Sequence, residues 1–350
     1  QWKIKGEKWF CSNANAELIL MTARFDHNKS GTKGLGLFLL PSHLPNGEKN
    51  NYTLRRLKNK IGTRSMASSE IDFNGAHAWP VGNLEEGFTL VMENVLHISR
   101  IFNTFAVLGQ SSRAYQIAKS YAHFREAFGK KIIEYPLVQE TLAKVKSEQL
   151  ALLAFIFKTT RLQDEADTNN EEKKLLLRTL VNLNKYISSL WTVEHIHRSI
   201  DILGGNGAIE SFSPLPRLLR DSIVCENWEG THNTLRMQIL RDIHRYKVDE
   251  LFISFLRNDL YHESFKESIN DLEKDFQSLK GQSESIQTLL IKDIVHKMSM
   301  IVSALCLSQE AAHQTEKIKE KALSLFRKIH LGSPSYDNDY LKLIKEINGI

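Results

Sequence analysis

Residues 225–233 read Cys-Glu-Asn-Trp-Glu-Gly-Thr-His-Asn, and the prediction of the fold starts from them. Gly230 lets the backbone turn sharply, and Thr231 is suited to cap the helix that we expect to follow. Glu229 then lies on a bend beside the indole of Trp228, where partial desolvation favours a general base. The same residues also fit an ordinary capped helix start with an exposed glutamate, so the interpretation depends on the rest of the chain.

Composition excludes several classes of protein. Of the 350 residues, 42% are hydrophobic and 25% charged, which is typical of a soluble globular protein with two or three domains. No apolar run reaches the roughly 18 residues that a membrane span needs, and no signal or transit peptide opens the chain. We therefore expect an intracellular protein, cytoplasmic in a bacterium and mitochondrial in a eukaryote. Because the sequence opens within an alternating strand pattern, we also expect a fragment or a processed product.

Cysteine and histidine spacing argues against a metal site. Cys11, Cys225 and Cys306 lie far apart and lack Cys-x-x-Cys spacing, so we expect neither a disulfide framework nor a zinc site. His195 and His197 are two residues apart on a predicted helix, so they point to different faces and cannot form an i, i+4 metal pair. We interpret both as surface or packing residues.

The hydrophobic pattern changes near Gly82 and predicts an α+β fold. Residues 1–82 predict a small antiparallel β-barrel or sandwich domain, because short alternating runs are separated by turn residues. A turn is also expected at Gly6-Glu7, within the first hairpin. The expected strands are residues 2–10, 17–25, 34–40, 52–60 and 70–73.

The remaining two parts are predicted to be helical. Residues 83–246 predict a long-helix bundle from their apolar spacing, with helices at residues 90–124, 138–167, 171–203, 215–221 and 234–246. Residues 247–350 predict an extra all-α C-terminal region, with helices at residues 249–280, 285–313, 315–329 and 338–347. From Arg245 onward, 15 Lys and Arg stand against 16 Asp and Glu, so we expect solvated helix faces and little or no DNA binding.

Four further motifs lie on elements of the expected kind. Residues 6–13 read Gly-Glu-Lys-Trp-Phe-Cys-Ser-Asn on the first strand, and the Gly-Phe pair at 87–88 leads into a helix with Arg100. Residues 125–129 read Arg-Glu-Ala-Phe-Gly, and residues 203–208 read Leu-Gly-Gly-Asn-Gly-Ala. Because the glycine run follows a helix and not a strand, it is not the fingerprint of a Rossmann fold.

Together with Trp-Glu-Gly-Thr, these motifs occur in the order found in the acyl-CoA dehydrogenase superfamily of flavoproteins, which residues 1–245 resemble. The resemblance implies FAD as cofactor, a fatty acyl-CoA as substrate and an electron acceptor such as electron-transfer flavoprotein. It also implies a homodimer or homotetramer. Members of the superfamily begin with a helical domain that this chain lacks, so we expect the chain alone to have an open pocket.

The resemblance assigns cofactor contacts to individual residues. Phe10 takes the position of the aromatic ring that packs on the isoalloxazine, and Ser12 that of a hydroxyl near flavin N5. Arg125 and Phe128 belong to the motif that contacts the cofactor bound mainly by the neighbouring subunit, where a planar guanidinium suits the pyrophosphate. The other implied contacts are Gly204, Gly205, Thr231 and Asn233.

By the same resemblance, Glu229 removes the α-proton of the thioester while flavin N5 accepts the β-hydride. Some branches place the base immediately before the arginine that corresponds to Arg100, but this chain has Ser99 there, so Glu229 is the expected catalytic residue. The C-terminal extension resembles those of the very-long-chain and adaptive-response (alkylation-damage) branches. The alternatives are therefore an adaptive-response flavoprotein or acyl-CoA binder with weak or no dehydrogenase activity, and a purely structural helical protein.

Overall fold

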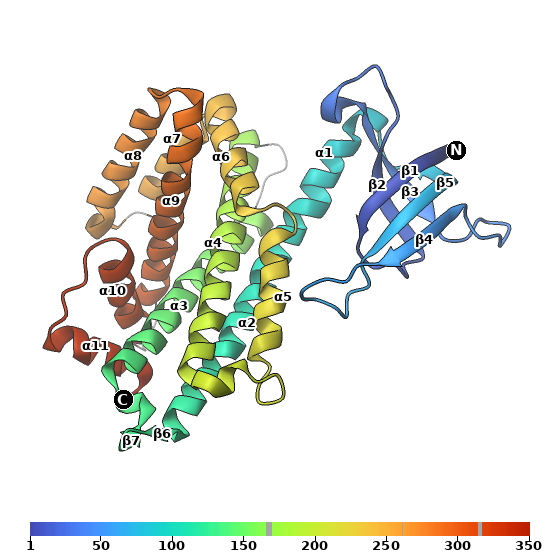
Figure 1. Cartoon of the computed structure of the whole chain (residues 1–350). Coiled ribbons are helices and arrows are strands. Elements are labelled where there is room, and N and C mark those ends of the chain that lie inside the picture. The colour runs from blue at the N-terminus through green and yellow to red at the C-terminus, as the bar shows by residue number, and fades with distance from the viewer. Residues whose placement is uncertain (166–169, 261, 314–316) are drawn as a thin grey trace. The chain divides into compact units, whose positions relative to one another are not determined.

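The computed structural model describes residues 1–165, 170–260, 262–313 and 317–350 (Figure 1). The chain divides into two compact units, residues 1–99 and residues 100–350, and each is described by itself. The sequence predicts three domains with boundaries at residues 82 and 246. The division into two units does not test these boundaries, so they remain a prediction.

The first unit is a curled antiparallel sheet. Strand β5 lies at its centre and pairs with β1, β3 and β4, while β2 pairs with β3. The buried side chains include Ile4, Phe38 and Ile71, which lie on three different strands and form one core. The strands are β1 (Trp2–Cys11), β2 (Leu18–Arg24), β3 (Leu35–Pro41), β4 (Tyr52–Leu57) and β5 (Ser69–Pro80).

The structure confirms the predicted antiparallel β-domain and corrects two of its details. The turn predicted at Gly6-Glu7 is wrong, because Gly6 pairs with Phe73 inside β1. A register shift after Ile4 and a φ of +134° at Gly6 make this point an irregularity of the strand. The fifth strand is longer than predicted and ends at Pro80, since its second half pairs with both β1 and β3.

A short helix, α1 (Gly87–Val91), packs on β3 in the same unit. A Cβ on Gly87 would lie 2.2 Å from the backbone nitrogen of Leu37, so only glycine fits at this contact. The Gly-Phe pair of the sequence motif therefore begins the helix that packs back on β3 after the last strand has ended.

The second unit is a bundle of long helices, and its C-terminal helices pack on the same bundle (Figure 1). Helices α9, α10 and α11 all contact α3. The helices are α2 (His97–Phe124, whose first residues belong to the first unit), α3 (Pro136–Asp164), α4 (Glu171–Leu203), α5 (Leu215–Asn227), α6 (His232–Tyr246), α7 (Val248–Asn258), α8 (Lys266–Lys280), α9 (Glu284–Ala312), α10 (Ile318–His330) and α11 (Asn338–Asn348). A two-strand hairpin, β6 (Glu126–Ala127) and β7 (Lys130–Lys131), joins α2 to α3.

Two helical predictions need correction. The helix predicted over residues 215–221 continues to Asn227 as α5, so the chain is helical up to Asn227. The helix predicted over residues 249–280 is two helices, α7 and α8, separated by residues 259–265. The predicted helix end at residue 167 and the predicted helix start at residue 315 lie outside the described residues. Within the described ranges, no helix is both long and apolar enough to cross a membrane.

Candidate active site

The loop between α5 and α6 holds Glu229 in an unusual backbone conformation. Trp228 ends α5 in an extended conformation, Glu229 has a φ of +58° and Gly230 a φ of +112°. Residues other than glycine rarely adopt positive φ, and such strain persists only where the surroundings enforce it. Thr231 then caps α6, accepting a hydrogen bond from the backbone N–H of Thr234 at 3.4 Å, which confirms the predicted cap.

Two buried cations hold the backbone carbonyls of this loop. Nε of Arg100, on α2, donates to the carbonyl oxygen of Glu229 at 3.0 Å. Nζ of Lys185, on α4, donates to the carbonyl oxygens of Glu226 at 2.9 Å and Gly230 at 2.8 Å. The strained conformation of Glu229 is therefore fixed from both sides by groups on two other helices.

The indole of Trp228 adds a third attachment. Its Nε1–H donates to Oδ1 of Asn103, on α2, at 2.6 Å, while Nδ2 of Asn103 donates to the carbonyl of Cys225 at 3.4 Å. Asn103 is buried, so its hydrogen bond to Cys225 is buried and the one from Trp228 is partly buried. The indole thus anchors the loop to α2, a role that the sequence did not predict for it.

One face of α4 supplies the polar support beneath the loop. Asn182, Lys185 and Ser189 follow at intervals of three and four residues, so they lie on one side of the helix. Oδ1 of Asn182 accepts from Arg100 at 2.7 Å, and the hydroxyl of Ser189 lies 3.4 Å from Nε2 of His232. The apolar spacing of α4 hides this face in the sequence, because the polar positions are buried among hydrophobic ones.

Burial dominates the electrostatics of the loop. It lowers the pKa of Lys185 to about 8, although the nearby charge of Glu229 acts in the opposite direction. Burial likewise lowers the pKa of Arg100, and Glu229 again opposes the shift. The pKa of His232 falls to about 4, through burial first and the cations Lys185 and Arg236 second. Glu229 thus lies within electrostatic range of both buried cations.

The predicted flavin contacts of the first unit line one cavity. Phe10 and Ser12 are among the residues around a hollow of about 340 Å³ beside β1 and β2. Phe10 is 57% exposed, so its ring is open to a ligand. Nζ of Lys58 lies 4.7 Å from the centre of that ring and 2.9 Å from the centre of the Trp9 ring.

The predicted contacts of the second unit lie on two of its loops and on α6. Arg125 is exposed at the end of α2, and Phe128 forms the β6–β7 turn with Gly129 at φ values of +52° and +88°. Phe128 is 97% exposed, so no packing explains its position. A Cβ on Gly204 or Gly205 would meet no atom within 4 Å, which leaves the backbone there open to a ligand.

Thr231 and Asn233 are exposed at the start of α6. Oδ1 of Asn233 accepts a hydrogen bond from Arg236 at 2.9 Å. The structure therefore brings Thr231 and Asn233 close to Glu229 along the chain. Phe10 and Ser12 belong to the first unit, which is described by itself.

A buried polar cluster in the bundle was not predicted. His195 lies 2.7 Å from the hydroxyl of Ser111 and 2.8 Å from Glu148, whose other oxygen lies 2.9 Å from Nε2 of His330. His195 is buried and His197 exposed, which confirms that they point to different faces. Across the described ranges, no group of three or more His, Cys, Asp or Glu side chains forms a metal site.

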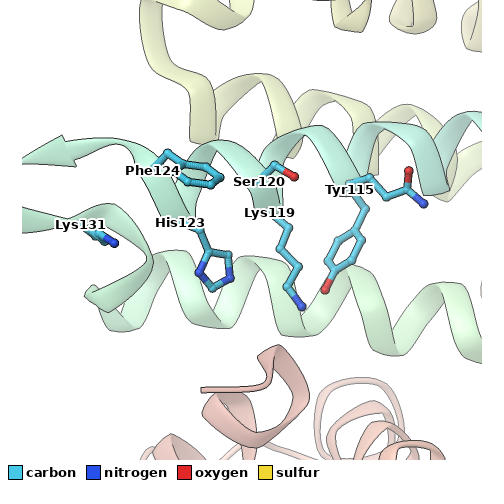
Figure 2. A pocket seen from close by; sticks show the side chains of 7 residues that line it. Tyr115, Lys119, Ser120, His123, Phe124 and Lys131 are labelled. Atoms are coloured by element: carbon cyan, nitrogen blue, oxygen red, sulfur yellow. The ribbon is translucent and has the colours of Figure 1, made fainter.

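A basic groove of about 530 Å³ runs along the end of α2 and is lined in part by Tyr115, Lys119 and Lys131 (Figure 2). Lys119, with burial as the larger cause, holds the pKa of Lys146 below its ordinary value. None of these lysines forms an ion pair within the described part of the chain. The groove contains none of the residues predicted to bind FAD.

The antiparallel sheet, the long-helix bundle and the held glutamate loop define the class of acyl-CoA dehydrogenase-like proteins. Residues 1–76 match the acyl-CoA dehydrogenase middle domain, and residues 85–244 match the acyl-CoA dehydrogenase C-terminal domain. The chain therefore belongs to the acyl-CoA dehydrogenase family, as its motifs predicted.

Two curated relatives resemble the chain beyond those two domains. Acyl-CoA dehydrogenase family member 11 of Caenorhabditis elegans is 31% identical over 297 residues, which are 83% of this chain and 48% of the relative. The putative acyl-CoA dehydrogenase AidB of Escherichia coli (strain K12) is 27% identical over 305 residues, which are 86% of this chain and 53% of the relative. The chain thus spans about half the length of these relatives.

A solved structure shows the same fold over nearly the whole chain. Caenorhabditis elegans ACDH-11, solved in complex with C11-CoA, has a TM-score of 0.80 and 27% sequence identity. The match covers 99% of this chain and 63% of that chain. The C-terminal helices beyond residue 244 are therefore part of the shared fold.

Proposed function

We propose that the chain forms the middle and C-terminal parts of an FAD-dependent acyl-CoA dehydrogenase, with Glu229 as its base. The observation that supports this most directly is the strained Glu229 loop, held by Arg100 and Lys185 from two other helices. A structural helix start needs no such arrangement, whereas a base must be held in place against its substrate.

The residues present fit FAD. The cavity at Phe10 and Ser12 offers an apolar ring and a hydroxyl, which suit an isoalloxazine. The open backbone at Gly204 and Gly205 allows close approach of a phosphate or a sugar, and the exposed guanidinium of Arg125 suits a pyrophosphate. When bound, FAD supplies the acceptor for the β-hydride of the acyl chain.

The part of Glu229 is to remove the α-proton of the thioester. The family resemblance assigns its backbone amide to the thioester carbonyl oxygen, where a donor makes the α-proton acidic enough to be removed. The cations Arg100 and Lys185 lie within electrostatic range of this carboxylate, whose charge acts to raise the pKa of both. The fatty acyl substrate, the electron acceptor and the assignment to a branch of the family are likewise parts of this proposal.

The test is Glu229→Gln in the complete protein, which keeps the shape of the side chain and removes its basicity. FAD content and acyl-CoA affinity should stay close to those of the wild type. Flavin bleaching by a saturated acyl-CoA under anaerobic conditions should slow by roughly 10² or more, as expected for a lost general base. Equal rates for both proteins would show that the base lies elsewhere.

The similarity to AidB favours a second candidate, an adaptive-response flavoprotein that binds acyl-CoA with weak or no dehydrogenase activity. The two candidates differ in one measurement. If the wild type binds FAD and acyl-CoA but no chain length bleaches the flavin, the binder takes the place of the dehydrogenase. A protein that shows no flavin absorbance after supply of FAD would exclude both.

A further inference from the structure

Lys185 is a buried cation whose hydrogen-bond partners are backbone oxygens. Its side chain is 0% exposed, and its Nζ donates hydrogen bonds to two backbone carbonyls of the loop. The two acceptors, the carbonyls of Glu226 and Gly230, lie on either side of Glu229 along the chain. Because burying a charge is costly unless it is compensated, this arrangement calls for an explanation.

The acceptors provide part of the compensation. The carbonyl of Glu226 belongs to the last turn of α5, where the negative end of the helix dipole favours a cation. The carbonyl of Gly230 has turned inward because Glu229 and Gly230 both have positive φ. Lys185 therefore connects the end of α5 to the residue after the base, across the segment in which Glu229 has its strained conformation.

We propose that Lys185 is the positioning residue for Glu229, and that its charge holds the loop in the conformation that places the carboxylate. This inference rests on the proposed function, in which Glu229 is the base. Arg100 performs the matching task at the carbonyl of Glu229, but arginine stays protonated at every accessible pH. Of the two cations that hold the loop, Lys185 is therefore the one that can lose its charge.

The charged groups around Lys185 determine when that happens. Glu229 on the loop and Glu226 on α5 favour the ammonium, and Arg100 on α2 opposes it. Cys225 acts weakly in favour, and His232 on α6 lies within reach of the same charge. With burial as the largest cause, the resulting pKa is about 8. A hydrogen bond from a neutral amine is weaker than one from an ammonium, so with Lys185 still buried the loop should loosen above this pH.

Loosening of the loop can be told apart from unfolding. The folded pKa of about 8 lies below the value of about 10.4 for a free lysine, so between them the unfolded chain binds more protons than the folded one. The contribution of Lys185 to the unfolding free energy therefore rises with pH in this window. Loss of activity through Lys185 should accordingly appear without any loss of global stability.

The experiment combines hydrogen exchange with a pH profile, both on the complete protein. In the wild type, amide protection of residues 226–234 should fall as pH rises through about 8, while that of the α9 core stays constant. Lys185→Met should show low protection at every pH. Lys173→Met, an exposed position on the same helix, is the control and should behave as the wild type.

Activity gives the second measurement. With an acyl-CoA substrate, the wild type should lose kcat above about pH 8, and Lys185→Met should lack this limb. Its kcat at neutral pH should be lower by roughly ten- to a hundredfold, the range for a slightly misplaced group, with KM little changed. Unchanged wild-type protection of residues 226–234 across pH 7–10 overturns the inference whether or not the variant folds. An inactive wild type with the expected exchange would instead contradict the proposed function alone.

Discussion

Gly230 is the position in the loop where the backbone conformation favours glycine over any other amino acid. Its φ of +112° is unfavourable for any residue with a Cβ, and that atom would lie 3.4 Å from Nη2 of Arg100. We expect Gly230→Ala to lower the unfolding free energy by about 1–3 kcal/mol in chemical denaturation. Gly281→Ala is the control, because Gly281 has an ordinary φ and a Cβ there would make only an ordinary contact, 3.6 Å from the carbonyl oxygen of Ser278. Equal stability of the two variants would show that the loop relaxes at little cost.

Protonation of His232 should lower the stability of the protein at acid pH. Its folded pKa of about 4 lies below the ordinary value of 6.5, so the contribution of neutral His232 is complete above pH 6.5 and is lost as pH falls toward 4. His232→Asn should therefore flatten the fall of the melting temperature between pH 6.5 and 4. The same acid slope in both proteins would assign it to other groups.

Residues near one another in sequence were the predictable part of the site. Thr231 as a cap and Gly230 as a bend follow from local signals, and the structure confirms both. The contact of Lys185 with the loop could not be predicted from the sequence, because 45 residues separate it from Gly230 and its neighbours on α4 follow an ordinary helical pattern. The sequence states which residues can bend or cap, whereas a contact between two helices depends on their packing.

At the scale of elements, the errors in the helical part lie where a helix ends. Periodicity continues smoothly across residues 249–280, yet α7 stops at Asn258 and a new start follows, where the ring of His262 accepts from the N–H of Ser264 at 3.3 Å. Asn and Asp are weak helix formers, so Asn258-Asp259 was the available signal. The sheet was predicted well because turn residues separate its strands.

The contact of α11 with α3 supports a prediction about cooperativity. Ile344 is buried against α3, the hydroxyl of Tyr340 donates to Glu140 at 2.6 Å, and Asn348 donates to the carbonyl of Gln139 at 2.7 Å. Ile344→Ala should cost about 2–5 kcal/mol and lower the melting temperature of the bundle as a whole. Lys345→Ala, exposed on the same helix, should cost almost nothing. A separate early transition in calorimetry would show that the C-terminal helices unfold alone.

At the scale of the whole molecule, we expect a homodimer or homotetramer. Phe128 and Arg125 are exposed at and beside the β6–β7 turn, and the family resemblance assigns them to the cofactor of a neighbouring subunit. Arg125→Ala should weaken FAD binding by roughly 1.5–3 kcal/mol, the range for a charge-assisted hydrogen bond. Sedimentation of the FAD-bound wild type as a monomer at micromolar concentration would contradict the assembly.

The packing of α3 also has a consequence for synthesis on the ribosome. Asn348 contacts Gln139 across 209 residues, and the hydroxyl of Ser147 donates to the carbonyl of Ala322 across 175. During translation, α3 therefore leaves the exit tunnel long before the helices that cover it have been made. For that interval its apolar face is open to aggregation or to a chaperone. Co-translational folding of the bundle should accordingly wait for its last helix, so premature stop codons near residue 338 should yield protein that is degraded.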